Sequence, residues 1–174
     1  MDFRIREWDG GGDEPAMLGR VLLACVHGGA SVSFVLPLSD EEARGYWAGS
    51  VSPAVRAGTK RVLLAEAAGQ VEGCVVLGLD TPPNQRHRAE VMKLLVHPES
   101  RRHGIARTLM AAVEEMARAC GRTLLTLDTR TGDAAERLYL SMGYQLAGVI
   151  PRFARGPHTP ALDGTSIFFK ELSG

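Results

Sequence analysis

Apolar and polar residues follow two periods along the chain, one typical of strands and one typical of helices. From Phe3 to Trp8 apolar and charged residues alternate, which predicts a short strand. Two apolar runs, 61–67 and 71–79, flank the turn-forming sequence Ala68-Gly69-Gln70 and predict a β-hairpin. Further strands are predicted over residues 88–96, 123–127, 144–150 and 165–172.

Two helices are predicted before the hairpin, each with a start signal. Asp13 suits an N-cap, and the helix that follows it has an apolar face and ends near Gly28. Ser39, with Glu42 three residues later, has the spacing of a capping box. The second helix therefore begins after Ser39, and Pro53 kinks or restarts it because proline removes a helical donor.

The second half of the chain alternates strands with helices. Residues 102–119 predict a long amphipathic helix. A shorter helix over 133–142 is expected to begin at Asp133, with Glu136 completing a capping box, and a loop is expected over 152–164. No internal repeat or linker interrupts the pattern. We therefore expect one α/β (α+β) domain over the whole chain, residues 1–174, with a mixed central sheet of about seven strands flanked by about four helices.

The composition supports a globular domain and gives no sign of a nucleic-acid partner. Hydrophobic residues make up 45% of the 174 residues and charged residues 23%, the usual globular mix. Basic and acidic residues number 20 each, so neither nucleic acid nor an anionic membrane is expected as the main partner. Cys25, Cys74 and Cys120 lack zinc-ligand spacing and are interpreted as reduced thiols, at least two of them buried. No metal is expected.

The N-terminal residues and the hydropathy of the chain bear on its location. Met1 to Glu7 places charges at alternate positions and lacks the apolar segment of a signal peptide. No apolar run approaches the ~20 residues needed to span a bilayer. We therefore expect a cytoplasmic protein, either a monomer or a homodimer.

The most informative segment is the junction between the strand over 91–96 and the long helix. The first turn of a helix leaves backbone N–H groups without partners, and the helix dipole adds partial positive charge there. Gly104 and Ala106 are small enough for a diphosphate to approach the main chain closely. Positive charge at the rim comes from Arg101, Arg102 and Arg107. The alternative is a basic, glycine-containing helix start that binds no ligand.

Two motifs in this order resemble the GNAT superfamily of acetyltransferases. The first, (Q/R)xxGx(G/A) between a strand and a long helix, is matched by Arg101, Gly104 and Ala106. The second, Axx(L/F)Y followed after three residues by G(F/Y), is matched by Ala135, Leu138, Tyr139, Gly143 and Tyr144. Many members carry Asn three residues before that alanine. This chain has Gly132 there, so one side-chain contact to the coenzyme is expected to be missing.

The resemblance implies a GNAT fold and an N-acetyltransferase that transfers acetyl from acetyl-CoA to an amine. In the family, backbone groups of the central strand pair with the pantetheine arm and the thioester oxygen. The expected coenzyme-binding residues are Leu94, Leu95, Val96, Arg101, Arg102, His103, Gly104, Ile105, Ala106, Arg107, Thr108 and Ala135.

A closer resemblance covers nearly the whole chain. Four segments, 26–32, 89–91, 127–129 and 167–170, are together similar to the tabtoxin-resistance acetyltransferases of this superfamily. Those enzymes acetylate the free amine of a β-lactam toxin. The resemblance implies a small acceptor and a role in toxin or antibiotic resistance, and it carries less weight for the acceptor than for the chemistry.

Three residues are expected to move protons during the transfer. The family pattern places Tyr139 near the coenzyme sulfur, where it would protonate the leaving thiolate. Glu90 and Asp128 lie on the strands expected to flank the cleft, and the resemblance makes both candidates for the base that takes the amine proton. Glu90 could instead pair with Arg88 or Lys93, whereas Asp128 has no evident structural duty.

The acceptor side is less specific in the sequence. We expect His27, Ser31 and Phe153 to contact a small-molecule primary amine that attacks the thioester directly in a ternary complex. A protein amine, either a terminus or a lysine, is the second interpretation. A closed loop over 152–164 would favour the small molecule and an open groove the protein.

A non-catalytic acyl-CoA sensor is the third interpretation. Such a protein would keep Gly104 and Ala106 but would lack acid and base groups. The presence of Glu90, Asp128 and Tyr139 argues against it.

Overall fold

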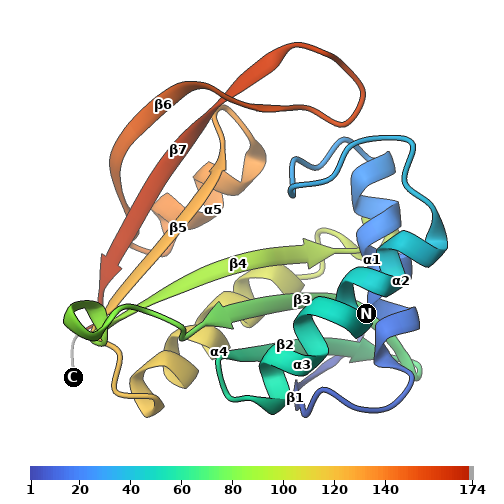
Figure 1. Ribbon diagram of the computed structural model, residues 1–174, viewed down its shortest axis with the longest axis horizontal. Helices are drawn as coiled ribbons and strands as arrows, with labels where there is room; N and C mark the ends of the chain where they lie inside the picture. The colour runs from blue at the N-terminus through green and yellow to red at the C-terminus, as the bar shows by residue number, and fades with distance from the viewer. Residues whose placement is uncertain (173–174) are drawn as a thin grey trace.

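The computed structural model describes residues 1–172 and contains a seven-stranded sheet with helices on both faces (Figure 1). The strands are β1 (Arg4–Trp8), β2 (Lys60–Ala67), β3 (Gln70–Gly78), β4 (Arg88–Val96), β5 (Leu124–Arg130), β6 (Gln145–Arg155) and β7 (Leu162–Glu171). The helices are α1 (Glu14–His27), α2 (Asp40–Tyr46), α3 (Ser52–Arg56), α4 (Ile105–Ala119) and α5 (Ala134–Ser141). Short turns of 3₁₀ helix cover Pro83–Gln85 and Pro98–Ser100.

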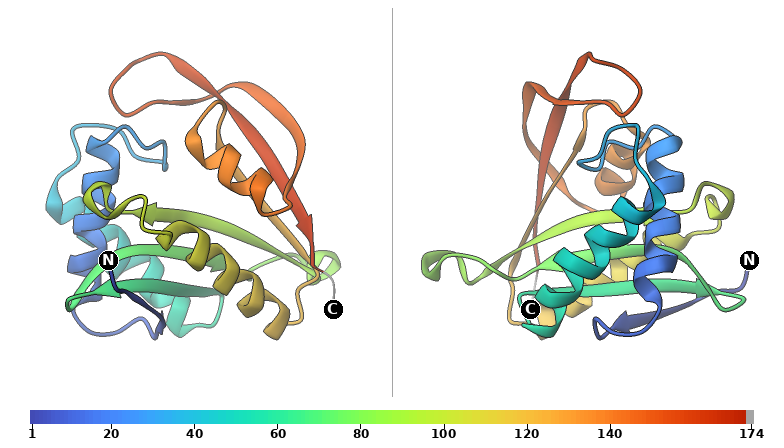
Figure 2. Two further views of the ribbon diagram at one scale, coloured as in Figure 1. Left: turned by 180° about the vertical axis from the view of Figure 1, so that it is seen from behind. Right: turned by 45° about the vertical axis from the view of Figure 1, so that its right-hand side comes forward.

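The strands lie in the order β1-β2-β3-β4-β5-β7-β6, and every pair is antiparallel except β4 with β5. α1 to α3 cover one face, in front in Figure 1, and α4 covers the other, as the view from behind in Figure 2 shows. Each face has its own buried core: Leu109 and Val113 of α4 belong to one, and Leu18 and Trp47 to the other. The expected mixed sheet flanked by helices is confirmed.

β4 and β5 pair only at their beginnings. Arg88, Ala89 and Glu90 lie opposite Leu124, Leu125 and Thr126, and the two strands then diverge (Figure 1). β5 continues beside β7 over its whole length. The edge of β4 that faces β5 therefore has no strand partner from Val91 onward, and a cleft can open inside a continuous sheet.

β4 also contains a β-bulge. Its pairing with β3 shifts between Cys74 opposite Leu95 and Val76 opposite Met92, and Lys93 within the shift has a φ of 53°. A bulge adds one residue to one strand and re-aims the side chains around it. Here Met92 packs in the core under α1, and Lys93 also reaches toward that side, to the segment that follows α1.

The predicted helix starts are partly confirmed. Ser39 and Glu42 form the expected capping box at α2. The stretch from α2 to α3 is continuous through a π-helical turn at Trp47–Val51, and α3 begins at the residue before Pro53. Asp133 caps α5 by accepting a hydrogen bond from the Ala134 amide. The capping box expected there is wrong, because the Glu136 carboxylate accepts from the Ser166 hydroxyl instead.

Two predicted boundaries are also wrong. The long helix begins at Ile105 and not at 102, because Arg102 and Gly104 have φ of 64° and 84°, which no α-helix accommodates. Residues 152–164 are not one loop, since β6 runs to Arg155 and β7 begins at Leu162. The proline in β6, Pro151, is tolerated because β6 is an edge strand and its register shifts between Ile150 and Ala154.

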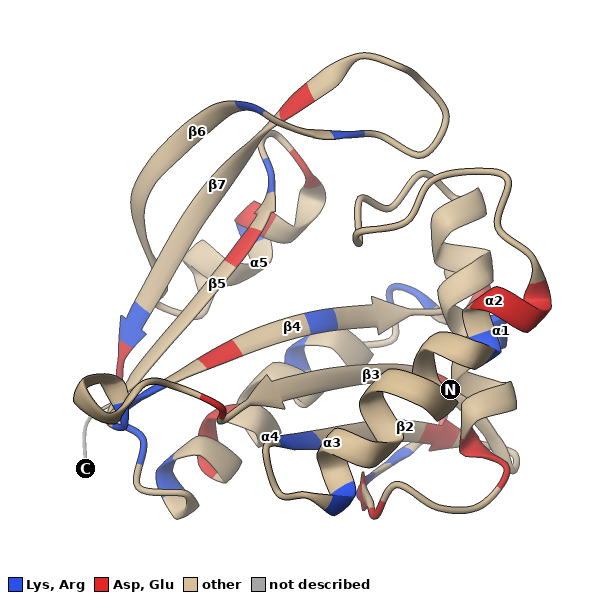
Figure 3. Cartoon of the chain, in the orientation of Figure 1, with Lys and Arg blue, Asp and Glu red and all other residues tan. Residues whose placement is uncertain are grey.

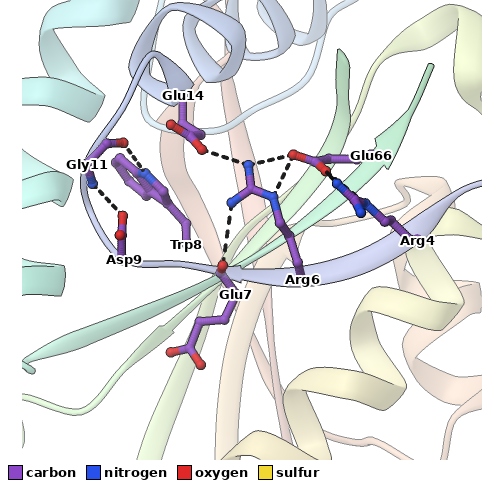
Figure 4. A network of polar contacts seen from close by, with 8 residues as sticks. All are labelled: Arg4, Arg6, Glu7, Trp8, Asp9, Gly11, Glu14 and Glu66. Atoms are coloured by element: carbon purple, nitrogen blue, oxygen red, sulfur yellow. Dashed lines mark hydrogen bonds and ion pairs between the residues drawn. The ribbon is translucent and has the colours of Figure 1, made fainter. Parts of the chain in front are cut away.

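A cluster of ion pairs fastens the first strand to its surroundings (Figure 4). Arg6 contacts the carboxylates of both Glu14 on α1 and Glu66 on β2, and Arg4 adds a second contact to Glu66 at 2.9 Å. These contacts raise the pKa of Arg6 and lower the pKa of Glu66. The network lies away from the cleft and has a structural role.

Candidate active site

A cavity of about 420 Å³ occupies the space where β4 and β5 diverge. Its walls come from the end of α1 and the segment after it, the second half of β4, the end of β5 and the first turns of α5. The lining residues are Cys25, Gly28, Gly29, Ala30, Ser31, Val32, Ser33, Val91, Met92, Lys93, Leu94, Leu95, Val96, Arg101, Ala106, Asp128, Thr129, Arg130, Asp133, Ala134, Ala135, Leu138 and Tyr139.

One side of the cavity, here called the α4 side, is formed by β4, residues 101–106 and α5. Gly104 is the N-cap of α4, and no side chain caps the helix, so its first N–H groups have no side-chain acceptor. A Cβ placed on Gly104 would meet nothing within 4 Å, so the approach to these groups is open. With Arg101 and Arg107 beside it, this helix start suits an anion such as a diphosphate.

Buried polar contacts hold the turn that leads into α4. Ser100 is 2% exposed, and its hydroxyl donates to Glu72 on β3 at 2.6 Å. Arg20 of α1 binds the other oxygen of the same carboxylate at 2.9 Å. Together these interactions lower the pKa of Glu72, although burial alone would raise it. The turn is therefore fixed to both α1 and β3 before any ligand arrives.

Tyr139 of α5 lies at the inner wall of the cavity. It is 6% exposed and packs against Tyr144 and Phe168, with ring centroids 5.8 and 5.9 Å away. Burial, with smaller contributions from Asp128 and Asp133, raises the pKa of the Tyr139 hydroxyl. The hydroxyl thus stays protonated at neutral pH and can act as a proton donor.

Asp128 of β5 contributes a carboxylate to the cavity. One of its oxygens accepts a hydrogen bond from the Thr165 hydroxyl of β7 at 2.9 Å, and the residue is otherwise exposed. The expectation that Asp128 has no structural duty is wrong, because this bond orients the side chain. The contact leaves the second oxygen available to accept a proton.

The opposite side of the cavity, here called the loop side, is formed by residues 28–33, Lys93 and Arg130. The Lys93 ammonium donates to the Val32 carbonyl at 2.9 Å and contacts the Ser33 hydroxyl at 3.1 Å. It also lies 5.8 Å from the Phe34 ring centroid and 5.7 Å from that of Tyr46. Burial lowers the pKa of Lys93.

The loop side is tied down from the β5 end and from the β6–β7 turn. Arg130 donates to the Gly29 carbonyl at 3.2 Å. The His158 ring nitrogen Nε2 lies 2.9 Å from the His27 carbonyl oxygen, and the Leu36 amide donates to Pro157 at 3.2 Å. These bonds join the segment after α1 to β5 and to the tip of the β6–β7 hairpin. Residues 156–161 of that tip cover the loop side and are here called the roof.

Cys25 also lines the cavity. Burial raises the pKa of this thiol, an effect that the nearby Arg101 partly offsets, and Sγ lies 3.4 Å from the Val96 carbonyl oxygen. Because the thiolate is the nucleophilic form, a buried thiol of raised pKa is a poor nucleophile. Cys25 and Cys74 are buried and none of the three cysteines forms a disulfide, as expected.

A family model described as the acetyltransferase (GNAT) family matches residues 30–144. The chain belongs to this family. The chain is similar to an IAA acetyltransferase of Azospirillum brasilense, with 33% identity over 111 residues, covering 64% of this chain and 67% of the relative. N-acetyltransferase 8F1 of Rattus norvegicus is 38% identical over 87 residues, covering 49% of this chain and only 39% of the relative. The chain therefore corresponds to part of the rat protein.

Solved structures with the same fold cover nearly the whole chain. A Salmonella typhimurium protein described with its cofactor acetyl-CoA has a TM-score of 0.81 at 19% identity, covering 100% of this chain and 96% of that chain. A ribosomal-protein-alanine N-acetyltransferase from Brucella melitensis has a TM-score of 0.81 at 25% identity, covering 97% and 99%. The GNAT fold is thus confirmed, and none of these four proteins carries a name that refers to tabtoxin resistance.

The GNAT cavity brings together about half of the residues expected at the site. Those that line it are Tyr139, Asp128, Leu94, Leu95, Val96, Arg101, Ala106, Ala135 and Ser31. Those outside its lining are Glu90, Arg102, His103, Gly104, Ile105, Arg107, Thr108, His27 and Phe153. Of these, Ile105 is buried in the core, and Phe153 is on β6 with 53% of its surface exposed.

Several of the expected residues outside the lining already have protein partners, including His103, whose Nδ1 lies 3.3 Å from the Ser100 carbonyl oxygen. The Thr108 hydroxyl donates to the Gly104 carbonyl, and Arg107 donates to the Ser141 hydroxyl at 2.6 Å. His27 contributes its carbonyl to the roof and not its ring. Glu90 is exposed on β4, and neither of its expected partners, Arg88 and Lys93, forms an ion pair with it.

Sequence reasoning missed Lys93 and Arg130 as cavity residues. Lys93 is the single charged residue in an otherwise apolar strand segment, 91–96, and a charge in such a segment is a signal of function or of a bulge. Arg130 is the last residue of β5, where side chains reach the open end of a sheet. Neither signal gives the role of the residue, which depends on the segment after α1.

Among residues 1–172, no helix combines the length and the apolar character needed to cross a bilayer. The same residues contain no cluster of three or more His, Cys, Asp or Glu side chains that could hold a metal ion.

Proposed function

We propose that this GNAT protein transfers the acetyl group of acetyl-CoA to the primary amine of a small molecule. The observation that carries the proposal is the cavity itself. The α4 side presents an open helix start and an unpaired strand edge. The loop side is covered by the β6–β7 turn, and the carboxylate of Asp128 lies in the cavity lining beside it. A coenzyme and an acceptor can therefore meet where β4 and β5 diverge.

The α4 side fits the coenzyme. The unpaired edge of β4 offers backbone groups of Leu94, Leu95 and Val96 to an extended pantetheine arm, in the manner of an added strand. The uncapped N–H groups after Gly104 suit the diphosphate. The absence of an asparagine at Gly132 leaves this recognition to the main chain and the arginines.

The proposed reaction needs one base and one acid. The acceptor nitrogen attacks the thioester carbon, a C–N bond forms and the amine proton passes to Asp128, directly or through water. The C–S bond then breaks, and the leaving thiolate takes the proton of the Tyr139 hydroxyl, which solvent later replaces. Glu90 is exposed outside the cavity lining, so we assign the base to Asp128 and leave Glu90 at most a relay through water.

We further propose direct transfer in a ternary complex. The competing route would pass the acetyl group through an enzyme thiol, and Cys25 is the thiol in the cavity. Its raised pKa argues against that role. Cys25→Ala should keep at least half of the turnover, and initial rates should give intersecting double-reciprocal lines. Parallel lines together with an inactive Cys25→Ala enzyme would replace this route by the covalent one.

The roof over the loop side supports a small acceptor over a protein. Contacts of His158, Pro157 and Arg130 with residues 27–36 cross the loop side and leave less room for a peptide than an open groove would. The Brucella melitensis neighbour is named for a protein substrate, so a protein amine stays the second candidate. A β-lactam toxin of the tabtoxin type is one acceptor within the small-molecule proposal. Cytoplasmic location, a single domain and a monomeric or homodimeric state stay predictions.

The experiment is an acceptor screen with purified protein. Release of free thiol from acetyl-CoA is followed with amines, amino acids, β-lactam toxins and peptides whose only amine is either the N-terminus or a lysine. Small amines should release thiol at least ~10-fold faster than peptides. Faster release with peptides would favour the protein acetyltransferase. No release with any amine, with acetyl-CoA binding intact, would favour the sensor.

A further inference from the structure

Lys93 is the charged residue that the second half of β4 contributes to the cavity wall. It projects from the bulge of β4, where its backbone adopts a positive φ, and its ammonium is largely enclosed by the segment after α1 and by two aromatic rings. Enclosing an ammonium costs free energy unless its charge is balanced. The position therefore calls for a compensating partner.

The protein supplies only neutral partners to this ammonium. Within residues 1–172, no carboxylate lies within ion-pair distance of Lys93, whose hydrogen-bond partners are a carbonyl and a hydroxyl. Arg130 on the same side differs, because it contacts Asp133 at 3.3 Å and Asp163 at 3.8 Å. Of Lys93 and Arg130 on the loop side, Lys93 is thus the cation without a direct ion pair, and Asp128 and Glu90 act on it only from farther away.

The ammonium also has hydrogen-bonding capacity left. It carries three donors, and two are directed to Val32 and Ser33. Lys93 lines the cavity, so the third donor can serve a ligand there. Asp128 stands on the other diverging strand and acts electrostatically on Lys93, as Glu90 does more weakly. Figure 3 shows a basic and an acidic segment on β4 and an acidic segment on β5. The cavity therefore presents the Lys93 ammonium and the Asp128 carboxylate to the same acceptor.

We propose that the acceptor is zwitterionic, with a carboxylate or similar anion close to its amine, and that Lys93 binds this anion while Asp128 faces the amine. The inference rests on the proposed acetyl transfer and names its substrate class. An amino acid or an amino-acid-like toxin has this arrangement of charges, and a simple alkylamine lacks it. Lys93 is then a residue of specificity and takes no part in proton transfer.

A purely structural role for Lys93 makes a different prediction. If the ammonium only tethered residues 32–34, its loss would weaken all acceptors alike. The test is therefore a ratio: kcat/KM for an amino acid divided by kcat/KM for its primary amide. The probes are alanine, methionine and phenylalanine, each used as the free acid and as the primary amide. The corresponding decarboxylated amines are tested as well. Because acid and amide differ in amine pKa, the ratio is compared between variants.

Lys93→Met removes the charge and keeps an unbranched stem, and it should lower the acid-to-amide ratio at least ~10-fold relative to wild type, the scale of a charged hydrogen bond. Lys93→Arg should keep most of the preference. Ser33→Ala is the matched control, because it removes one tether contact and leaves the cation, so the ratio should stay within ~2-fold.

The failures can be told apart. An equal loss on acids and amides in Lys93→Met would make Lys93 a tether and overturn the inference. Transfer to amides and alkylamines with none to the acids would overturn it too, and would leave the proposed function standing. No transfer to any amine would remove the proposed function and this inference with it.

Discussion

The two sides of the cavity recognise ligands by different means. The α4 side, with β4, residues 101–106 and α5, offers main-chain groups, a glycine N-cap and exposed arginines. The loop side, with residues 28–33, Lys93 and Arg130, offers enclosed charged side chains held by hydrogen bonds. The α4 side binds mainly through main-chain N–H and C=O groups, which any helix start and strand edge provide. The loop side binds through individual side chains of this chain.

This difference separates what a family shares from what a member adds. Main-chain recognition survives most substitutions, so the α4 side can serve one coenzyme throughout a family. The loop side is assembled from single side chains, and one substitution can change the acceptor. Variants on the two sides should therefore fall into separate kinetic classes, which the following experiments test from the largest expected effect to the smallest.

Asp128→Asn should have the largest effect. It keeps an oxygen that can accept from Thr165 and removes the basic function, so turnover should fall ~100- to 10,000-fold while coenzyme affinity is unchanged. The rate should recover as pH rises from 6 to 9, because more of the amine is already neutral. Steady-state rates and coenzyme titrations measure both quantities.

Glu90→Gln is the matched control for Asp128→Asn, since Glu90 is an exposed carboxylate on the neighbouring strand outside the cavity lining. Its turnover should stay within ~3-fold of wild type. Equal losses in both variants would restore Glu90 as a partner in the base function. Wild-type rates in the double variant across this pH range would mean that positioning and substrate pKa suffice.

Tyr139→Phe should lower turnover ~100-fold, the lower end of the range for a general acid. The ring keeps its packing against Tyr144 and Phe168, so coenzyme affinity should stay within ~3-fold. Because burial raises the pKa of Tyr139, the hydroxyl remains an acid at pH 9 and wild-type activity should not fall on the alkaline side from its ionisation. An alkaline loss of rate that disappears in Tyr139→Phe would contradict this assignment.

Gly104→Asp should reduce coenzyme affinity at least ~10-fold and leave acceptor KM unchanged, because it places a negative charge at a helix start that suits a diphosphate. Gly104→Asn is the control: both side chains tolerate a positive φ, so the pair differs mainly in charge. Thermal shifts with CoA and acetyl-CoA measure the affinity. Similar affinity in the two variants would place the diphosphate elsewhere.

His158→Ala should have the smallest effect. It removes one exposed hydrogen bond of the roof, so acceptor KM should rise ~3-fold with coenzyme affinity unchanged. A protein substrate predicts the opposite, because a looser roof would open a groove. Peptide acetylation that increases in this variant would therefore favour the second candidate function.

The α4 side could be predicted from sequence because it is nearly contiguous. The strand over 91–96, the glycine and the helix start follow one another, and the helix alone dictates where free N–H groups lie. Only the details failed: Arg102 adopts a positive φ that no sequence rule assigns to arginine, so the helix begins three residues late.

The loop side could not be predicted in the same way. Lys93 meets Val32 and Ser33 across about sixty residues of chain, and Arg130 meets Gly29 across about one hundred. Such contacts depend on where β4 and β5 separate, and no local sequence pattern predicts that point. The loop predicted over 152–164 failed for a related reason, because its turn-forming residues hide the end of an edge strand with a register shift.

The bulge in β4 limits how this segment can change length over evolutionary time. Side chains of a strand alternate between faces, so loss of one residue at the bulge would exchange the faces of all that follow. Leu95 would leave the core under α1, and Leu94 and Val96 would leave the core under α4. The turn at Gly69, where nothing lies near, can accept an insertion. β4 can therefore accept substitutions of its side chains, but a one-residue deletion at the bulge should be selected against because it would disrupt both cores.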